Sequence, residues 1–184
     1  MRKINISKKT LRWLTVPGLV VVVNSASYAE IYLTIEQAKQ VIFPDETLTN
    51  ISFVLTDAQC KEILKKSGIS VRRKEVKAWR TSQGDYLIVD EVLGKHEYIT
   101  YAVGINYDGG VRQIEIMDYR ETYGYQIKNK DWRDQFVGKK SNDPFKLNQD
   151  IKNISGATLS CRHVADGVKR VLALYELVLS KQQN

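Results

Sequence analysis

Residues 153–180 read NISGATLSCRHVADGVKRVLALYELVLS, and this stretch decides the fold. After a polar loop, its apolar residues recur at intervals of three and four, which is the spacing of one face of an α-helix. The residues on this face are Val164, Val168, Val171, Leu172, Tyr175, Val178 and Leu179. We therefore predict a long C-terminal helix, from about Ser160 to Ser180, that packs one face against a sheet.

Four small residues, Ser155-Gly156-Ala157-Thr158, lead into this helix. The first turn of a helix has backbone N–H groups without intrahelical partners and carries the positive end of the helix dipole. One interpretation is an N-cap, in which Ser155 or Thr158 accepts hydrogen bonds from these groups. The other is a phosphate site, in which Gly156 and Ala157 leave room for the anion. Ser155, Thr158 and Ser160 would then offer hydroxyls to it, and at this point both interpretations stand.

Two shorter helices are predicted upstream. In LTIEQAKQVIF (33–43), Thr34 is a plausible N-cap and Pro44 ends the helix. In LTDAQCKEILKKSG (55–68), Thr56 plays the same part and Gly68 stops the helix. The residues expected to face inward are Ile35, Ala38, Val41 and Ile42 in the first helix, and Cys60, Ile63 and Leu64 in the second.

Strand-like runs fill the middle of the chain. VKAWRT (76–81) and DYLIVDEVLG (85–94) flank a turn at Gln83-Gly84-Asp85, and EYITYAVGINYDGGVRQIEIMDYRE (97–121) predicts a hairpin around Tyr107-Asp108-Gly109-Gly110. Residues 120–154 are loop-like with short elements. This order of helices, antiparallel strands and a final helix predicts an α+β fold, an antiparallel sheet packed with helices.

At this point the residues resemble a known family. ISGATLSCRHVADGVKRVL (154–172) resembles the modification loop of FMN-binding domains in subunits of the sodium-pumping NADH:quinone reductase, of the Rnf electron-transport complex, and in stand-alone exported bacterial proteins. YRETYGYQI (119–127) resembles the Glu-Thr-containing loop of the same family, which lies near the flavin ring. The resemblance covers roughly residues 80–175.

The resemblance implies FMN as the cofactor, bound through a phosphoester to the hydroxyl of Thr158. A separate periplasmic flavin transferase would make that bond from FAD with a divalent metal. The cofactor-binding residues that it implies, together with the polar neighbours of the phosphate, are Ser155, Gly156, Ala157, Thr158, Leu159, Ser160, Glu121, Thr122, Tyr123, Gly124, Arg162 and His163. Each also has an ordinary structural interpretation, as a cap, a turn or a solvated side chain.

One position departs from the family pattern. The family has an acidic residue three positions before the motif serine, where this chain has Lys152, with Asp150 two residues further back. The resemblance therefore implies FMN binding more directly than a covalent bond to FMN. Asp90 and the segment GKHE (94–97) are interpreted as a structural turn, with a functional loop as the alternative.

The first 29 residues predict a signal peptide, with a retained anchor as the alternative. Five basic residues precede an apolar run of 11 residues, Trp13–Val23, and Ser27 and Ala29 fit a cleavage site. Five of the 28 Lys and Arg and none of the 21 Asp and Glu lie before residue 30, which leaves 23 basic against 21 acidic residues, a net charge of +2. We therefore expect no nucleic-acid partner. Residues 30–184 would form a single FMN-binding domain.

The remaining motifs narrow the chemistry. The sequence contains no CxxC, CxxCH, HExxH or GxGxxG pattern, which leaves haem attachment, zincin chemistry and direct NADH oxidation without support. Cys60 and Cys161 could form a disulfide or be two buried thiols. We expect an exported electron carrier in the periplasm or at the outer face of the bacterial inner membrane, working between membrane-bound redox partners. The alternatives are an FMN-dependent reductase of a small terminal acceptor and a flavin-free binding module.

Overall fold

The computed structural model describes residues 33–183, and its centre is a six-stranded antiparallel sheet. The strands are β1 (Leu48–Asn50), β2 (Phe53–Val54), β3 (Glu75–Thr81), β4 (Tyr86–Leu93), β5 (Tyr98–Ile105) and β6 (Val111–Tyr119). Their order is β1-β3-β4-β5-β6, and β2 pairs with another part of β3. Strands β3 to β6 thus follow one another as a meander, as the turn sequences predict.

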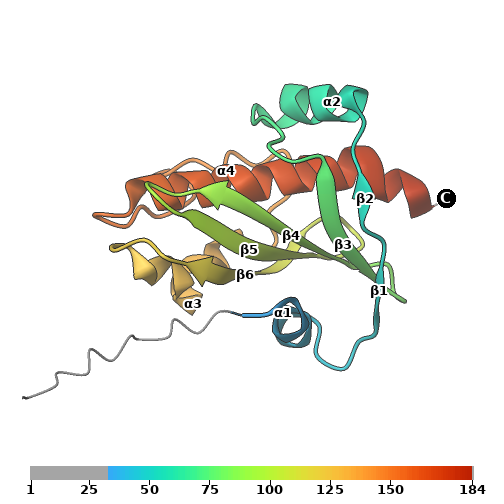
Figure 1. Cartoon of the computed structure of the whole chain (residues 1–184), viewed down its shortest axis with the longest axis horizontal. Coiled ribbons are helices and arrows are strands. Elements are labelled where there is room, and N and C mark those ends of the chain that lie inside the picture. Colours follow the sequence, from blue (N-terminus) through green and yellow to red (C-terminus); the bar gives the residue numbers. More distant parts are fainter. Residues whose placement is uncertain (1–32, 184) are drawn as a thin grey trace, which may run out of the picture.

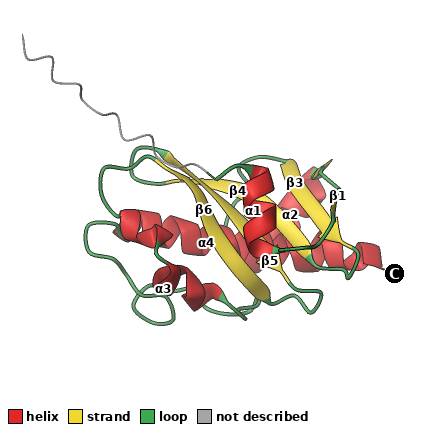
Figure 2. Ribbon diagram, turned by 90° about the horizontal axis from the view of Figure 1, so that it is seen from below, coloured by secondary structure: helices red, strands yellow, loops and turns green. Residues whose placement is uncertain are grey.

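Helices cover both faces of this sheet (Figures 1 and 2). They are α1 (Ile35–Ile42), α2 (Asp57–Ser67), α3 (Lys130–Arg133) and α4 (Thr158–Leu174). The long helix α4 continues into a π-helical turn, Tyr175–Leu179, and a final 3₁₀ turn, Ser180–Gln183. Short 3₁₀ turns at Tyr125–Lys128 and Asp134–Phe136 flank α3. The predicted α+β class is confirmed.

Local hydrogen bonding explains where the two early helices begin and end. Thr34 and Thr56 each accept a hydrogen bond from the backbone three residues on, and Gln37 and Gln59 complete capping boxes. Gly68 ends α2 in the left-handed conformation, as predicted.

Two of the residues expected to face inward are exposed instead. Val41 is 47% exposed and Leu64 is 45% exposed. Each lies next to the residue that does pack inward, Ile42 in α1 and Ile63 in α2. Successive helical residues are about 100° apart around the axis, so each narrow buried face excludes the neighbour.

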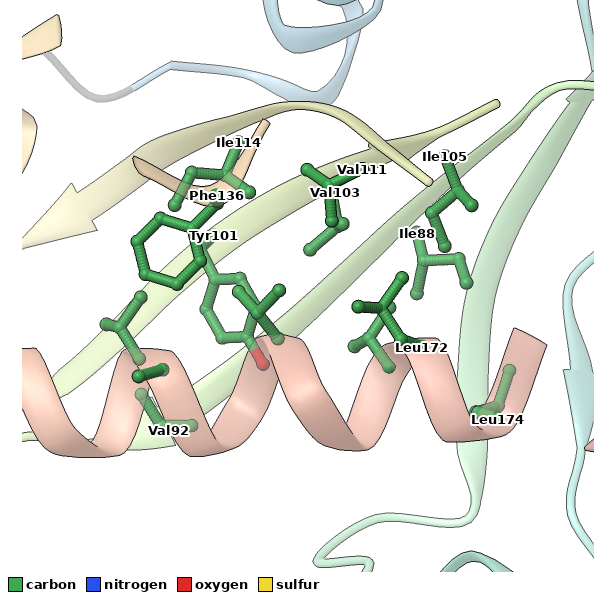
Figure 3. Close-up of a cluster of buried hydrophobic side chains, with 14 of the residues drawn as sticks. Ile88, Val92, Tyr101, Val103, Ile105, Val111, Ile114, Phe136, Leu172 and Leu174 are labelled. Carbon is green, nitrogen blue, oxygen red and sulfur yellow. The ribbon is translucent and has the colours of Figure 1, made fainter. Parts of the chain in front are cut away.

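The larger core lies between α4 and the sheet (Figure 3). Ile88, Val92, Tyr101 and Val103 meet Leu172 and the other residues of the predicted α4 face, all of which are buried. A smaller core on the opposite face packs α1 against the sheet, with Ile42, Phe43, Trp79 and Leu87 at its centre. Because the central strands are covered on both sides, the first four residues of β4, Tyr86–Val89, are all apolar and buried.

Two expectations concern the chain's compartment. Within residues 33–183, no helix is long and apolar enough to cross a membrane, and the predicted signal peptide lies outside the described residues. Cys60 and Cys161 are free thiols, the first partly buried and the second buried, so the disulfide alternative does not hold. Burial raises the pKa of the Cys161 thiol, as expected for a packing residue.

Candidate cofactor site

A cavity of about 300 Å³ lies at the N-terminal end of α4. Three segments far apart in sequence enclose it: the start of α4, the loop after β6, and the turn between β4 and β5, which Figure 1 shows at the same end of the helix. The lining residues are Lys95, His96, Glu121, Thr122, Tyr123, Gly156, Ala157, Thr158, Leu159 and Ser160. Both motifs singled out in the sequence therefore contribute to one cavity.

The N-terminus of α4 has no side-chain cap. Ala157 is the N-cap residue, and neither Ser155 nor Thr158 accepts a hydrogen bond from the first turn. No hydrogen bond between described residues uses the backbone N–H groups of Thr158, Leu159 or Ser160. The capping interpretation is therefore wrong, and the positive end of the helix is open toward the cavity.

The loop before α4 leaves this end uncovered. Gly156 has a φ of +80°, a conformation that side-chain-bearing residues rarely adopt, and a Cβ there would meet nothing within 4 Å. Ala157 donates its backbone N–H to the Ile154 carbonyl over 3.0 Å, which closes the turn. An approaching anion would thus meet backbone N–H groups, not side chains.

The loop after β6 is locked against the same turn. A Cβ on Gly124 would lie 2.1 Å from the Cβ of Ala157, so only glycine allows this approach. The Tyr119 hydroxyl donates to the Tyr123 carbonyl over 2.5 Å and lies 3.2 Å from the Ser160 hydroxyl. These contacts give a physical reason why the two motifs occur in one chain, because each holds the other in place.

Glu121 connects this loop to the third segment. Its Oε1 accepts hydrogen bonds from the backbone N–H of His96 over 2.7 Å and of Glu97 over 3.1 Å. Burial raises the pKa of the Glu121 carboxyl, but the backbone hydrogen bonds from this segment outweigh burial and leave the pKa below its ordinary value. Glu121 is therefore ionised at neutral pH and is bonded to protein backbone.

Four of the predicted site residues do not line the cavity. Ser155 and Arg162 are exposed, and Gly124 packs against Ala157 behind the wall. The Nδ1 of His163 contacts the Leu93 carbonyl, and the ring lines a different, smaller pocket with Asp166 and Arg170. Their roles toward a cofactor stay predictions, and for His163 the geometry favours a structural part.

Two lining residues, Lys95 and His96, were assigned in the sequence to a structural turn. The only signal in the sequence was the polar segment GKHE itself. The hydrogen bonds that hold this segment beside the cavity are accepted by Glu121, which lies 25 residues from His96 and 24 residues from Glu97. Asp90, from the same region, bonds Arg170 and Tyr101 in the core instead.

The segment around Lys152 is also held by structural contacts. The Lys152 backbone donates to Gln135 over 2.6 Å and accepts from the Trp132 indole over 2.9 Å, while its side chain is exposed. Asp150 pairs with Lys139 at 2.9 Å and accepts from the backbone of Phe145 and Lys146. These bonds lower the pKa of Asp150 against the opposing effect of burial. Among residues 33–183, no group of three or more His, Cys, Asp or Glu is placed to hold a metal ion.

The residues present fit the phosphate end of a flavin mononucleotide. The cavity has an open helix N-terminus, a loop of small residues and the Thr158 side chain, and its volume is in the range of small-molecule sites. Residues 94–173 match the family model described as FMN-binding domain. No curated protein matches the chain. The match spans the β4–β5 turn, the Glu-Thr loop and α4, and it identifies the chain as one that carries a domain of the FMN-binding family, with FMN as its cofactor.

Proposed function

We propose that this chain is an exported electron-transfer protein whose FMN is linked through its phosphate to the Thr158 hydroxyl. The observation that carries the proposal is the position of Thr158. It is the first residue of α4, its side chain lines the cavity, and no described residue hydrogen-bonds its hydroxyl. A phosphate esterified there would lie beside the free N–H groups of the first turn.

The attachment follows from ordinary phosphoryl chemistry. The Thr158 oxygen would attack the phosphorus on the FMN side of FAD, forming the phosphoester bond as the pyrophosphate bond breaks. AMP would leave with the displaced oxygen, and the hydroxyl proton would pass to a base of the transferase. The protein's own part is to present the hydroxyl and stabilise negative charge at the helix end.

The rim of the cavity supports electron transfer to a partner protein. Tyr123 is 74% exposed and Leu159 is 40% exposed, and both line the cavity. A bound flavin would supply one- or two-electron chemistry, and the protein would position it and tune it. An open, partly apolar rim lets a redox partner approach the cofactor closely.

The proposed location follows from the predicted leader. Export would place the domain in the periplasm or at the outer face of the inner membrane, where lost FMN is not replaced. A covalent or tightly held phosphate keeps the cofactor in place there. The partners would be a flavin transferase, which loads the protein, and membrane-bound redox proteins, which exchange electrons with it.

The test is expression with and without a flavin transferase, followed by denaturing electrophoresis with in-gel flavin fluorescence and intact mass. We expect fluorescence and a flavin-sized mass increase in the wild type only with the transferase. Thr158→Ser keeps a hydroxyl and should retain some label, whereas Thr158→Ala should lose it completely.

Other outcomes separate the alternatives. Flavin that is present in the native protein but released on denaturation would contradict the covalent bond and leave FMN binding standing. A protein that takes up no flavin under any condition would overturn the proposal and favour a binding module. Turnover of a small acceptor by the loaded protein alone, with an artificial donor, would favour the reductase alternative.

A further inference from the structure

The residues that line the cavity include Lys95 and His96, in the turn between β4 and β5. Lys95 is the only residue with a permanent positive charge among the described residues that line the cavity. Its side chain is exposed, and no described residue forms an ion pair with it. The charge is therefore available to a bound molecule.

The carboxylate of Glu121 holds the backbone of this turn in place. Besides the hydrogen bonds from His96 and Glu97, the backbone of Lys95 also interacts with this carboxylate. Gly94 makes room for it, since a Cβ there would lie 2.4 Å from the Glu121 Oε1. The Gly94 N–H also donates to the Glu97 carbonyl over 2.8 Å, which closes the turn. The hydrogen-bond-accepting oxygen of Glu121 thus fixes the segment that carries Lys95.

We propose that Lys95 faces the ring system of the bound flavin and raises its reduction potential, and that Glu121 is a positioning residue that acts through the backbone of residues 94–97. This inference rests on the proposed function. The helix N-terminus and Thr158 would hold the phosphate at the lining contributed by α4, which leaves the ring to the residues of the other two segments, Lys95 among them. Glu121 itself is committed to backbone N–H groups rather than to the cofactor.

The expected effect follows from charge. Reduction adds negative charge to a flavin, and a cation nearby stabilises the reduced form more than the oxidised form. Removal of the Lys95 charge should therefore lower the midpoint potential. A tenfold change in the relative stability of the two forms corresponds to about 30 mV for a two-electron couple.

The first experiment compares Lys95→Gln with wild type, both loaded with FMN, by spectroelectrochemical titration. We expect Lys95→Gln to have a midpoint potential lower by about 30 mV, the tenfold change above. Any fall in its affinity for FMN should be matched by an equal fall in its affinity for riboflavin, which lacks the phosphate. Lys65→Gln is the matched control, because Lys65 is an exposed lysine on α2, outside the cavity.

The second experiment separates position from charge at Glu121. Gln keeps a side-chain oxygen that accepts the two backbone N–H groups, whereas Ala does not. We expect Glu121→Gln to retain FMN affinity within about threefold and not to lower the potential. Glu121→Ala should lower the potential as far as Lys95→Gln does, because the turn is no longer fixed.

Different results would overturn each part of this inference. An unchanged potential in Lys95→Gln, or a loss of affinity for FMN but not for riboflavin, overturns the placement of Lys95 at the ring. An equal fall in the midpoint potential of Glu121→Gln and of Glu121→Ala overturns the positioning role of Glu121. Both results require a wild type that binds FMN, so they leave the proposed function intact, whereas a flavin-free wild type removes both proposals.

Discussion

At the scale of single residues, the site depends on one contact between two motifs. Gly124 has a φ of +89°, and its Cα faces Ala157, the N-cap residue of α4. An added methyl would overlap the Ala157 Cβ and lie 2.8 Å from the Tyr119 hydroxyl. Because the Ala157 Cβ is attached directly to the backbone, the overlap with it cannot be relieved by a side-chain rotation.

We predict that Gly124→Ala lowers the free energy of unfolding by about 2–4 kcal/mol, from overpacking and the left-handed backbone together. FMN affinity should fall at least tenfold, because the start of α4 is displaced. Urea unfolding and FMN titration provide the measurements. Gly138→Ala is the matched control, since Gly138 has a φ of +79° and open space around it.

A second substitution makes the test sharper. Removal of the opposing methyl in Gly124→Ala/Ala157→Gly should restore part of the FMN affinity, since glycine is well tolerated at an N-cap position. If Gly124→Ala is no less stable than Gly138→Ala, the contact does not hold the two motifs together.

At the scale of elements, a buried ion pair fixes α4 along the sheet. The Arg170 side chain lies in the core with only 6% of the residue exposed, and its guanidinium bonds Asp90 of β4 at 2.6 Å. The Tyr101 hydroxyl donates to the same carboxylate over 3.0 Å, and Figure 3 shows that hydroxyl directed toward α4. Burial, and then the charge of Asp90, raise the pKa of Tyr101 well above its ordinary value, so it remains a donor.

We predict that Asp90→Ala destabilises the protein by about 3 kcal/mol, because a buried guanidinium is left without its counter-charge. The double variant Asp90→Ala/Arg170→Met should be more stable than Asp90→Ala, since it also removes the unpaired charge. Glu91→Ala is the control, because the Glu91 carboxylate pairs only with the exposed Arg73 among the described residues and should cost less than about 1 kcal/mol. A double variant no more stable than Asp90→Ala in urea would contradict this account.

The elements also show what the sequence could and could not predict. The buried face of α4 and the caps at Thr34, Thr56 and Gly68 depend on residues within a few positions of each other, so local patterns predicted them. His163 was expected near the cofactor because it is close to Thr158 in sequence. Five residues along a helix correspond to about 140° of rotation, which turns its ring toward Leu93.

The same reasoning explains why one wall of the site was missed. The turn that carries Lys95 and His96 is held at the cavity by the carboxylate of Glu121, which follows the next hairpin. A contact between residues so far apart in the chain has no local sequence pattern. The open end of α4 was also undecided in the sequence, since small hydroxyl residues suit a cap and a phosphate site equally. Only the backbone conformation at Gly156 and Ala157 distinguishes the two.

At the scale of the whole molecule, the sheet lies between the core on the α1 face and the cofactor site on the α4 face. The face covered by α4 carries the cavity at one end, while the face covered by α1 carries the smaller core. The contact on that second face is close, since a Cβ on Gly104 would lie 2.3 Å from the Ile42 side chain. Helix α1 packs against β6, and the loop that lines the cavity follows β6, so α1 is connected to the cofactor residues through the sheet.

This separation predicts that damage to the α1 face lowers stability without weakening FMN binding. Ile42 is buried to 2% exposure, so Ile42→Ala should lower the free energy of unfolding by about 2–4 kcal/mol, and Ile42→Val by about 1 kcal/mol. The FMN dissociation constant, measured by fluorescence on the folded protein at low temperature, should stay within about twofold of the wild-type value for both, because mutations so far from the site act independently of it. If FMN affinity instead falls in step with stability across the two variants, the sheet transmits the change to the start of α4, and the two faces form one cooperative unit.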